Sequence, residues 1–184
     1  MSKDAVVFTT TYYDQSEDGR LRKELALDFV ERAVNLDYPL IVLDGGTDSG
    51  KFIDQLKTIG ANAYLETKRG LGPSRRESHE YARWFAKERG INNLVWSEPE
   101  KIDFVESIGY LVEKMKETQV GLIVPSRNSM ESYPAAQWHS ETFGNQLHTD
   151  VGYLDINGNP LDQFAGPHIW STRVAPYFQI FDDT

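Results

Sequence analysis

The sequence predicts an α/β fold, with a mostly parallel sheet flanked by helices. Two observations support this. Short apolar segments alternate with amphipathic helical segments along residues 5–124, as in parallel sheets built from strand–helix–strand units. The apolar segments are also nearly continuous runs, which is typical of strands covered on both faces. Residues 125–184 break the alternation. We therefore expect a single domain over residues 1–184, with an α/β half at 5–124 and an appended lobe at 125–184.

Five strands are expected in the α/β half. Residues 5–11 are apolar and β-branched, and residues 39–43 form a second short apolar run that stops at an Asp-Gly-Gly turn. Both patterns favour buried strands. Similar but shorter runs predict strands at residues 61–65, 93–96 and 121–124.

Helical spacing and capping signals define the connections. Apolar residues recur at helical spacing over residues 21–34. A second helix is expected to end at Gly60, because glycine readily adopts the left-handed conformation found there. Ser74 and Glu77 fit a capping box at the start of a third helix, and Pro99 suits the first turn of a fourth. The lobe carries a further helical pattern near residues 137–147.

Composition excludes several classes of function. The chain has 28 acidic and 19 basic residues, a net charge of −9, and no cysteine. The acidity argues against general binding of nucleic acid or anionic lipid. The lack of cysteine rules out disulfides, thiolate metal ligands and thiol nucleophiles. No apolar run is long enough to span a bilayer and the first residues do not resemble a signal peptide, so we expect a cytoplasmic protein.

Ligands of parallel α/β sheets bind at the carboxyl ends of the strands. The segments to consider are residues 10–19, 44–48, 66–73, 97–100 and 125–134. A phosphorylated ligand of so acidic a chain would need local positive charge from side chains, a helix N-terminus or a metal ion.

A basic loop is the first candidate. Lys68, Arg69 and Gly70 precede a predicted helix. Glycine lets backbone approach a ligand, and a helix N-terminus favours an anion. The pattern suits a pyrophosphate site, although a solvated loop explains it equally well.

Acidic residues supply the second set of candidates. Glu98 and Glu100 follow the fourth strand and could together bind a divalent cation, while the alternative is the ordinary preference for acids in a first helical turn. Asp44, at the end of the second strand, could contact a ribose or base, or cap a turn. Asp162 and His168, in the lobe, could supply an acid–base group and a metal ligand, or be structural.

Residues 45–51 match the first seven positions of a P-loop. The eighth position is Phe52, where Ser or Thr would hold Mg²⁺. A chance match is the better interpretation.

Taken in order, these loops resemble those of GT-A-type nucleotide-sugar glycosyltransferases, near glycosyltransferase family 2, over about residues 5–180. Residues 8–13 correspond to the family's nucleotide-binding loop, and residues 43–48 resemble its Asp-rich turn. Residues 68–72 match a basic, glycine-containing loop. Residues 98–100 (Glu-Pro-Glu) occupy the place of the D-x-D motif, which holds the metal and the donor diphosphate.

Two later motifs extend the resemblance. Residues 124–127 correspond to a motif of the G-S-R type, and residues 162–166 to an acceptor-side D-x-x-x-G segment. In some relatives a nearby histidine completes the metal site, and His168 is the candidate here.

The resemblance implies transfer of a sugar from a nucleoside-diphosphate sugar to an acceptor that the sequence does not identify, assisted by Mg²⁺ or Mn²⁺. It implies Asp162 as the residue that activates or positions the acceptor. The metal ligands would be Glu98, Glu100 and His168. The donor-binding residues would be Thr9, Thr10, Asp44, Lys68, Arg69, Gly70, Glu98 and Arg127.

Two other functions stay open. The Glu-Pro-Glu substitution favours a non-catalytic GT-A-like module that binds a nucleotide or glycan. A nucleotidyltransferase that makes the sugar nucleotide is less favoured. Such enzymes usually carry a glycine-rich basic loop after the first strand, and the segment from Thr9 to Arg20 offers only Gly19 and Arg20.

Overall fold

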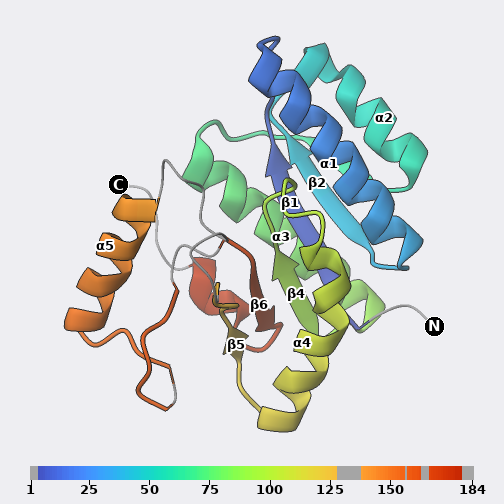
Figure 1. The fold of residues 1–184 in the computed structure, drawn as a ribbon. Coiled ribbons are helices and arrows are strands. Elements are labelled where there is room, and N and C mark those ends of the chain that lie inside the picture. The colour runs from blue at the N-terminus through green and yellow to red at the C-terminus, as the bar shows by residue number, and fades with distance from the viewer. Residues whose placement is uncertain (1–3, 128–137, 156, 163–165, 180–184) are drawn as a thin grey trace. The chain divides into compact units, whose positions relative to one another are not determined.

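The computed structural model describes residues 4–127, 138–155, 157–162 and 166–179. Its contacts divide the chain into two compact units, Met1–Ile123 with Ile169–Thr184, and Val124–His168. The first unit holds the sheet and helices α1 to α4, and the second holds α5 (Figure 1). Residues 169–179, which the sequence pattern assigned to the lobe, therefore belong with the sheet. The single domain over residues 1–184 stays a prediction.

The sheet has six strands in the order β3-β2-β1-β4-β6-β5 (Figure 1). They are β1 (Val6–Thr11), β2 (Leu40–Asp44), β3 (Asn62–Leu65), β4 (Asn93–Trp96), β5 (Leu122–Ile123) and β6 (His168–Ser171). Strand β1 pairs in parallel with both β2 and β4, and β2 pairs in parallel with β3. The registers place Thr11 opposite Asp44 and Phe8 opposite Trp96. The carboxyl ends of β1, β2 and β4 therefore meet at one edge of the sheet.

The far edge of the sheet differs from the prediction. Strand β5 pairs antiparallel with β6, which lies between β4 and β5. A strand was expected at residues 121–124, but none at 168–171. The apolar run of Ile169 and Trp170 is too short to indicate a strand alone. It becomes one by pairing with β5, a long-range contact that local sequence does not encode.

The helices connect the strands as expected, with two corrected starts. The elements are α1 (Glu17–Asn35), α2 (Lys51–Ile59), α3 (Leu71–Arg89), α4 (Phe104–Thr118) and α5 (Trp138–Asp150), with 3₁₀ turns η1 (Thr47–Gly50) and η3 (Ala175–Gln179). Helix α2 ends at Gly60 in the left-handed conformation, as predicted. Helix α3 begins three residues before Ser74, so the capping box does not form. Helix α4 begins at Phe104 rather than near Pro99.

The core lies on both faces of the sheet, because alternate residues of a strand point to opposite sides. Val7 of β1 belongs to a buried cluster with Phe29 of α1 and Phe52 of α2. Its neighbour Phe8 belongs to a second cluster with Ala82 of α3 and Trp170 of β6. Burial on both faces explains why the strands read as continuous apolar runs rather than alternating ones.

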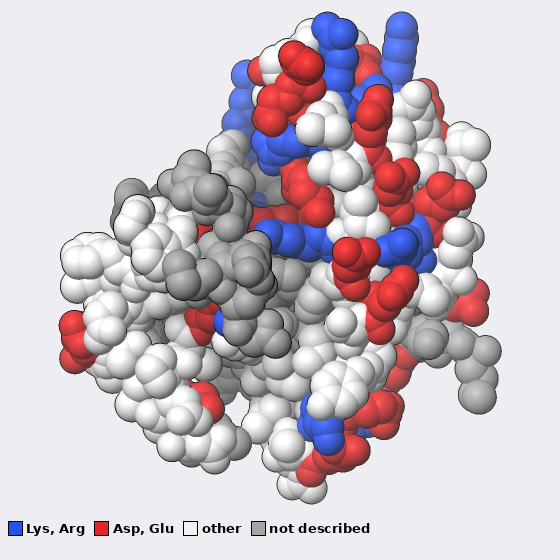
Figure 2. All heavy atoms as spheres, in the orientation of Figure 1, with Lys and Arg blue, Asp and Glu red and all other residues white. Residues whose placement is uncertain are grey.

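Ion pairs on the surface contribute little to the stability of the folded protein. Acidic and basic side chains lie beside one another over α1, α2 and α4 (Figure 2). The pair between Arg32 and Asp103, 2.7 Å apart, involves a fully solvated carboxylate, and such pairs contribute about 0–1 kcal/mol. Among the helices of the described residues, none is both long and apolar enough to cross a membrane.

Candidate functional site at the carboxyl ends of β1 and β4

A small cavity of about 130 Å³ opens at the sheet edge where ligands of this class of fold bind. Its walls are the end of β1 with the segment that follows (residues 9–13) and the end of β4 with residues 98–100. Arg22 comes from α1 and Arg75 from α3. The cavity is smaller than the about 300–1,000 Å³ of typical ligand pockets, so it could enclose only part of a nucleotide.

Arg75 is held against the cavity by an aromatic side chain. Its Cζ atom lies 4.5 Å from the centre of the Trp96 ring. Burial lowers the pKa of Arg75, and the negative charge of Glu98 opposes this shift. The guanidinium stays charged. Within the described part of the chain, it forms no ion pair within 4.0 Å. A stacked guanidinium of this kind is pre-organised to bind an anion.

Arg22 is fixed on the other side of the cavity. Its Nε donates to Glu100 Oε1 at 2.7 Å, and its Cζ atom lies 5.5 Å from the centre of the Tyr13 ring. Burial acts to lower the pKa of Arg22, but the hydrogen bond and charge of Glu100 outweigh it and raise the pKa. Glu100 thus forms an ion pair with Arg22.

Two buried hydroxyl groups at the cavity have no hydrogen-bond partner among the described residues. Thr9 and Tyr13 both line it, and both hydroxyls are buried without a partner among the residues described. Burial, with a smaller effect from Glu100, raises the pKa of Tyr13, so its hydroxyl stays neutral and can donate. A buried hydroxyl without a partner costs about 1–3 kcal/mol, which a polar ligand could recover.

The predicted metal ligands do not fit a divalent cation in this structure. Glu100 is bonded to Arg22, and Glu98 Oε2 lies 4.0 Å from the ammonium group of Lys101. His168 belongs to the second unit, where its Nδ1 lies 2.7 Å from the carbonyl oxygen of Gly166. Across the described residues, no group of three or more His, Asp or Glu side chains is arranged to hold an ion. Mg²⁺ and Ca²⁺ need six or more oxygen ligands from protein and water, and the two glutamates already have cationic neighbours.

Asp44 is hydrogen-bonded to the backbone and hydroxyl groups of the segments beside the cavity. It is fully buried, and its carboxylate accepts hydrogen bonds from the Thr11 hydroxyl (2.8 Å), the backbone N–H groups of Gly46 and Thr47 (2.9 and 2.7 Å) and the Thr47 hydroxyl (2.7 Å). The backbone N–H of Tyr13 then donates to the Thr47 hydroxyl at 3.0 Å. Asp44 thereby ties the turn after β2 to the segment after β1. A role as a direct nucleotide contact stays a prediction, and these bonds favour a positioning role.

The loop with Lys68, Arg69 and Gly70 does not line this cavity. It follows β3, the edge strand, and these three residues are exposed. Glu77 of α3 shapes the loop by accepting from the Thr67 hydroxyl at 2.6 Å and the Lys68 backbone N–H at 3.2 Å. Their role in donor binding stays a prediction. Thr9, Thr10 and Glu98 are the predicted donor-binding residues that the structure brings together.

Arg127 and Asp162 are partners within the second unit. The Asp162 carboxylate accepts from Arg127 Nε and Nη2, both at 2.8 Å, and from Asn145 Nδ2 at 2.8 Å. Arg127 Nη1 also donates to Glu141 Oε2 at 2.6 Å. Burial acts to raise the pKa of Asp162, but these bonds lower it to about 2. Such a carboxylate is a weak base. Its catalytic role stays a prediction, and the contacts favour a role in holding this unit together.

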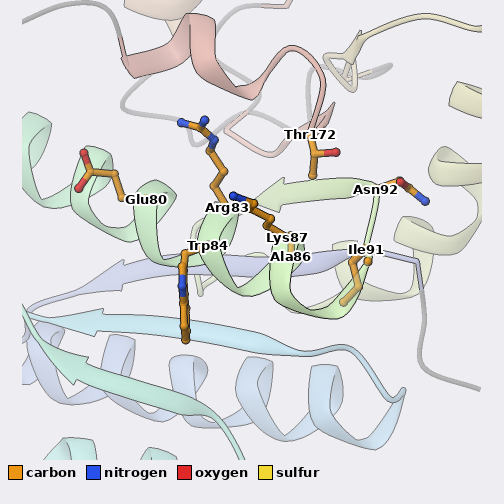
Figure 3. Close-up of a pocket in the computed structure, with 9 residues that line it drawn as sticks. Glu80, Arg83, Trp84, Ala86, Lys87, Ile91, Asn92 and Thr172 are labelled. Atoms are coloured by element: carbon orange, nitrogen blue, oxygen red, sulfur yellow. The ribbon is translucent and has the colours of Figure 1, made fainter.

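A larger cavity of about 610 Å³ lies elsewhere on the first unit (Figure 3). Arg83, Lys87 and Trp84 all extend from α3, and Trp84 points away from the two basic side chains (Figure 3). Residues 90–92 also line this cavity, and they precede β4. It therefore lies at the amino end of that strand, opposite the edge where ligands of parallel sheets bind.

Sequence reasoning missed the two arginines and the tryptophan. Trp96 is the last residue of β4, immediately before the acidic segment, and an aromatic residue at a strand end was the available signal. Arg75 lies one turn into α3 and is exposed, so the sequence does not distinguish it from an ordinary solvated residue of a helix. Only the packing of α3 against β1 and β2 brings it to the strand ends.

The comparisons with known proteins support the fold. No protein-family model matches the chain, and no curated protein matches it. Among solved structures, the chain is similar to 4-diphosphocytidyl-2C-methyl-D-erythritol synthase from Anaerococcus prevotii, with a TM-score of 0.51, 12% identity, and coverage of 99% of this chain and 81% of that one. At this identity the similarity shows a shared fold and not a shared reaction. The predicted fold, a mixed and mostly parallel sheet of the nucleotide-diphospho-sugar transferase (GT-A) type, is confirmed.

Two further solved structures are similar to the chain with lower TM-scores. One is to a protein described as a nucleotide-diphospho-sugar transferase from Desulfovibrio desulfuricans, with a TM-score of 0.42 and 14% identity over 65% of this chain and 56% of that one. The other is to core-mannan synthase A from Aspergillus fumigatus in its Mn/GDP form, with a TM-score of 0.40 and 13% identity over 96% and 63%. The chain thus spans less than two thirds of either protein. The placement near glycosyltransferase family 2 remains a prediction.

Proposed function

We propose that the chain is a glycosyltransferase that takes a sugar from a nucleoside-diphosphate sugar, and that the donor binds at the cavity between the ends of β1 and β4. The observation that carries the proposal is the pair of guanidinium groups there. Arg75 stacks on Trp96, and Arg22 is oriented by Glu100. In a chain with a net charge of −9, two fixed arginines at the ligand-binding edge favour an anionic ligand.

The arrangement suits the chemistry of sugar transfer. Negative charge develops on the leaving nucleoside diphosphate as the bond to the sugar breaks, and fixed cations stabilise that charge. The hydroxyls of Thr9 and Tyr13 could donate to oxygen atoms of the donor. The acceptor is not assigned. Asp162 would have to exchange its bonds to Arg127 before it could activate an acceptor hydroxyl.

A nucleotidyltransferase is the second candidate. It is favoured by one observation, namely that the solved structure with a TM-score of 0.51 is a synthase of a diphosphocytidyl compound. The two candidates differ in substrate. A glycosyltransferase uses a nucleoside-diphosphate sugar and releases the nucleoside diphosphate. A nucleotidyltransferase joins a nucleoside triphosphate to a phosphorylated substrate and releases pyrophosphate.

A binding panel tests the shared part of the proposal. UDP, GDP, CDP, ADP and their sugar conjugates are titrated into the protein by calorimetry and by thermal unfolding. Saturation at about 100-fold over Kd should stabilise the fold by about 2.7 kcal/mol, or about 5–10 °C in Tm. Release of nucleoside diphosphate from the sugar conjugates supports the first candidate. Pyrophosphate release from nucleoside triphosphates supports the second, and binding without turnover supports a binding module.

Matched arginine variants test the location. Arg75→Ala should weaken binding by about 10- to 100-fold, because a hydrogen bond to a charged group contributes about 1.5–3 kcal/mol. Arg89→Ala is the control. Arg89 also stacks on an aromatic ring of α3, with its Cζ atom 5.0 Å from the Phe85 ring centre, but it does not line the cavity. The proposal fails if no nucleotide binds, or if the two variants bind it equally well.

A further inference from the structure

We infer that this cavity binds the diphosphate of its ligand through Arg22 and Arg75, without a divalent cation bridging Glu98 and Glu100. The inference rests on the proposed function and adds to it the means by which the diphosphate is neutralised. Three features of the cavity carry it.

The first feature is the state of the two carboxylates. Glu100 Oε1 accepts from Arg22 Nε at 2.7 Å, and the Glu100 side chain is only 21% exposed. Glu98 Oε2 lies 4.0 Å from Lys101 Nζ. A divalent cation bridging both glutamates would have to bind beside the positive charges of Arg22 and Lys101. Repulsion from these two cationic groups would oppose metal binding.

The second feature is the donor capacity that remains on the arginines. Arg22 uses Nε for Glu100, and its side chain is 50% exposed. Its two terminal nitrogens make no hydrogen bond to the residues that the structure describes. Arg75 uses none of its nitrogens in this way. Guanidinium groups bind phosphate oxygens through pairs of parallel hydrogen bonds, so each arginine could hold one phosphate group.

The third feature is the way both guanidinium groups are fixed. Trp96 holds Arg75 at 4.5 Å, and Tyr13 lies beneath Arg22 at 5.5 Å. Holding a long side chain in place before binding removes part of the entropy cost of ordering it. Glu100 is therefore a positioning residue for Arg22, and the Glu-Pro-Glu segment serves to orient an arginine where a D-x-D motif would hold a metal.

The test measures binding of UDP, GDP, CDP and ADP with excess EDTA and again with Mg²⁺ or Mn²⁺. For the tightest of the four, Kd should agree within about threefold between the two conditions. Arg22→Ala and Arg75→Ala should each weaken binding in EDTA by about 10- to 100-fold. Arg75→Lys keeps the charge but loses the paired donors, so it should restore only part of the affinity.

Glu100 supplies the discriminating variant. Glu100→Gln keeps a hydrogen-bond acceptor for Arg22 but removes the charge that a cation needs. We expect Kd for this variant to agree within about threefold between EDTA and metal, as in the unaltered protein. Arg89→Ala again serves as the control, and thermal unfolding checks that every variant folds.

Two results would overturn the inference, and they are distinguishable. If a nucleoside diphosphate binds more than about tenfold tighter with Mn²⁺ or Mg²⁺, and Glu100→Gln abolishes that gain, the cavity uses a metal and the proposed function stands. If none of the four nucleotides binds in either condition, the proposed function and this inference fail together.

Discussion

His79 gives the sharpest prediction about stability. It lies on α3, is only 4% exposed, and packs among the rings of Phe8, Trp170 and Phe178. Its Nε2 accepts a hydrogen bond from Trp170 Nε1 at 3.1 Å, while its Nδ1 is buried without a partner in the described residues. Burial, with a smaller effect from the positive charge of Arg83, lowers the pKa of His79 to about 4. The folded protein therefore keeps this imidazole neutral.

The sign and size of the pH effect follow from this pKa. The unfolded chain takes up a proton on His79 below its ordinary pKa of 6.5, whereas the folded protein does so only near 4. The stabilising effect of a neutral His79 is thus complete above pH 6.5 and is lost as the pH falls toward 4. Going down to about pH 5 crosses about 1.5 pH units of this window, at about 1.4 kcal/mol per unit. The expected loss is about 2 kcal/mol.

The assay is urea unfolding at about pH 7.5 and pH 5, with His79→Gln as the variant. Glutamine can accept from Trp170 but does not titrate, so its free energy of unfolding should fall by about 2 kcal/mol less than that of the unaltered protein. His139→Gln is the control, because His139 is exposed and lies outside the ring cluster around His79. Equal pH dependence in the unaltered protein and His79→Gln would refute the reasoning.

Three further predictions concern other buried groups. Asp44→Ala should lower the free energy of unfolding by about 3–5 kcal/mol, since four hydrogen bonds lose their acceptor; a loss below about 1 kcal/mol in urea unfolding would contradict the positioning role. The pKa of Asp162 is about 2 when folded and 3.8 ordinarily, so its contribution of about 2 kcal/mol is complete above pH 4 and is lost between about pH 4 and pH 2. The free energy of unfolding of Asp162→Asn should not show this loss in acid. If Asp162→Asn and the unaltered protein lose the same stability between about pH 4 and pH 2, the bonds to Arg127 are not responsible. Phe29→Ala should cost about 3–5 kcal/mol because Phe29 is fully buried, whereas Phe143→Ala, at a side chain that is 66% exposed, should change stability by less than about 0.5 kcal/mol; similar costs for both would contradict the assigned core.

Much of the fold could be predicted from local sequence. The runs that became β1 and β2 are continuous and β-branched because both faces of these strands are covered. Strand β6 could not be predicted in this way, because its two central apolar residues become a strand only by pairing with β5. The start of α3 was also misplaced, since Glu77 bonds to the loop before the helix and not to a cap.

The candidate site also combines residues that the sequence indicated with residues that only tertiary packing brings there. The resemblance to GT-A-type glycosyltransferases implied Thr9, Thr10 and Glu98 as donor-binding residues, and the structure places these three around one cavity. The resemblance did not lead to Arg22 and Arg75, because both come from helices and reach the cavity only through tertiary packing. Because the chain is acidic, a site for a phosphorylated ligand was expected to contain local positive charge. At this cavity the structure supplies two candidates from helices, Arg22 and Arg75, and the role of the basic loop at residues 68–70 stays a prediction.

Hydrogen–deuterium exchange with a saturating nucleoside diphosphate tests the central claim most directly, because it locates the ligand on the first unit. Binding between the ends of β1 and β4 predicts slower exchange in residues 9–13 and 96–101, and little change in residues 83–92 around the larger cavity. Slower exchange confined to residues 83–92, or no change in either segment, would contradict the account.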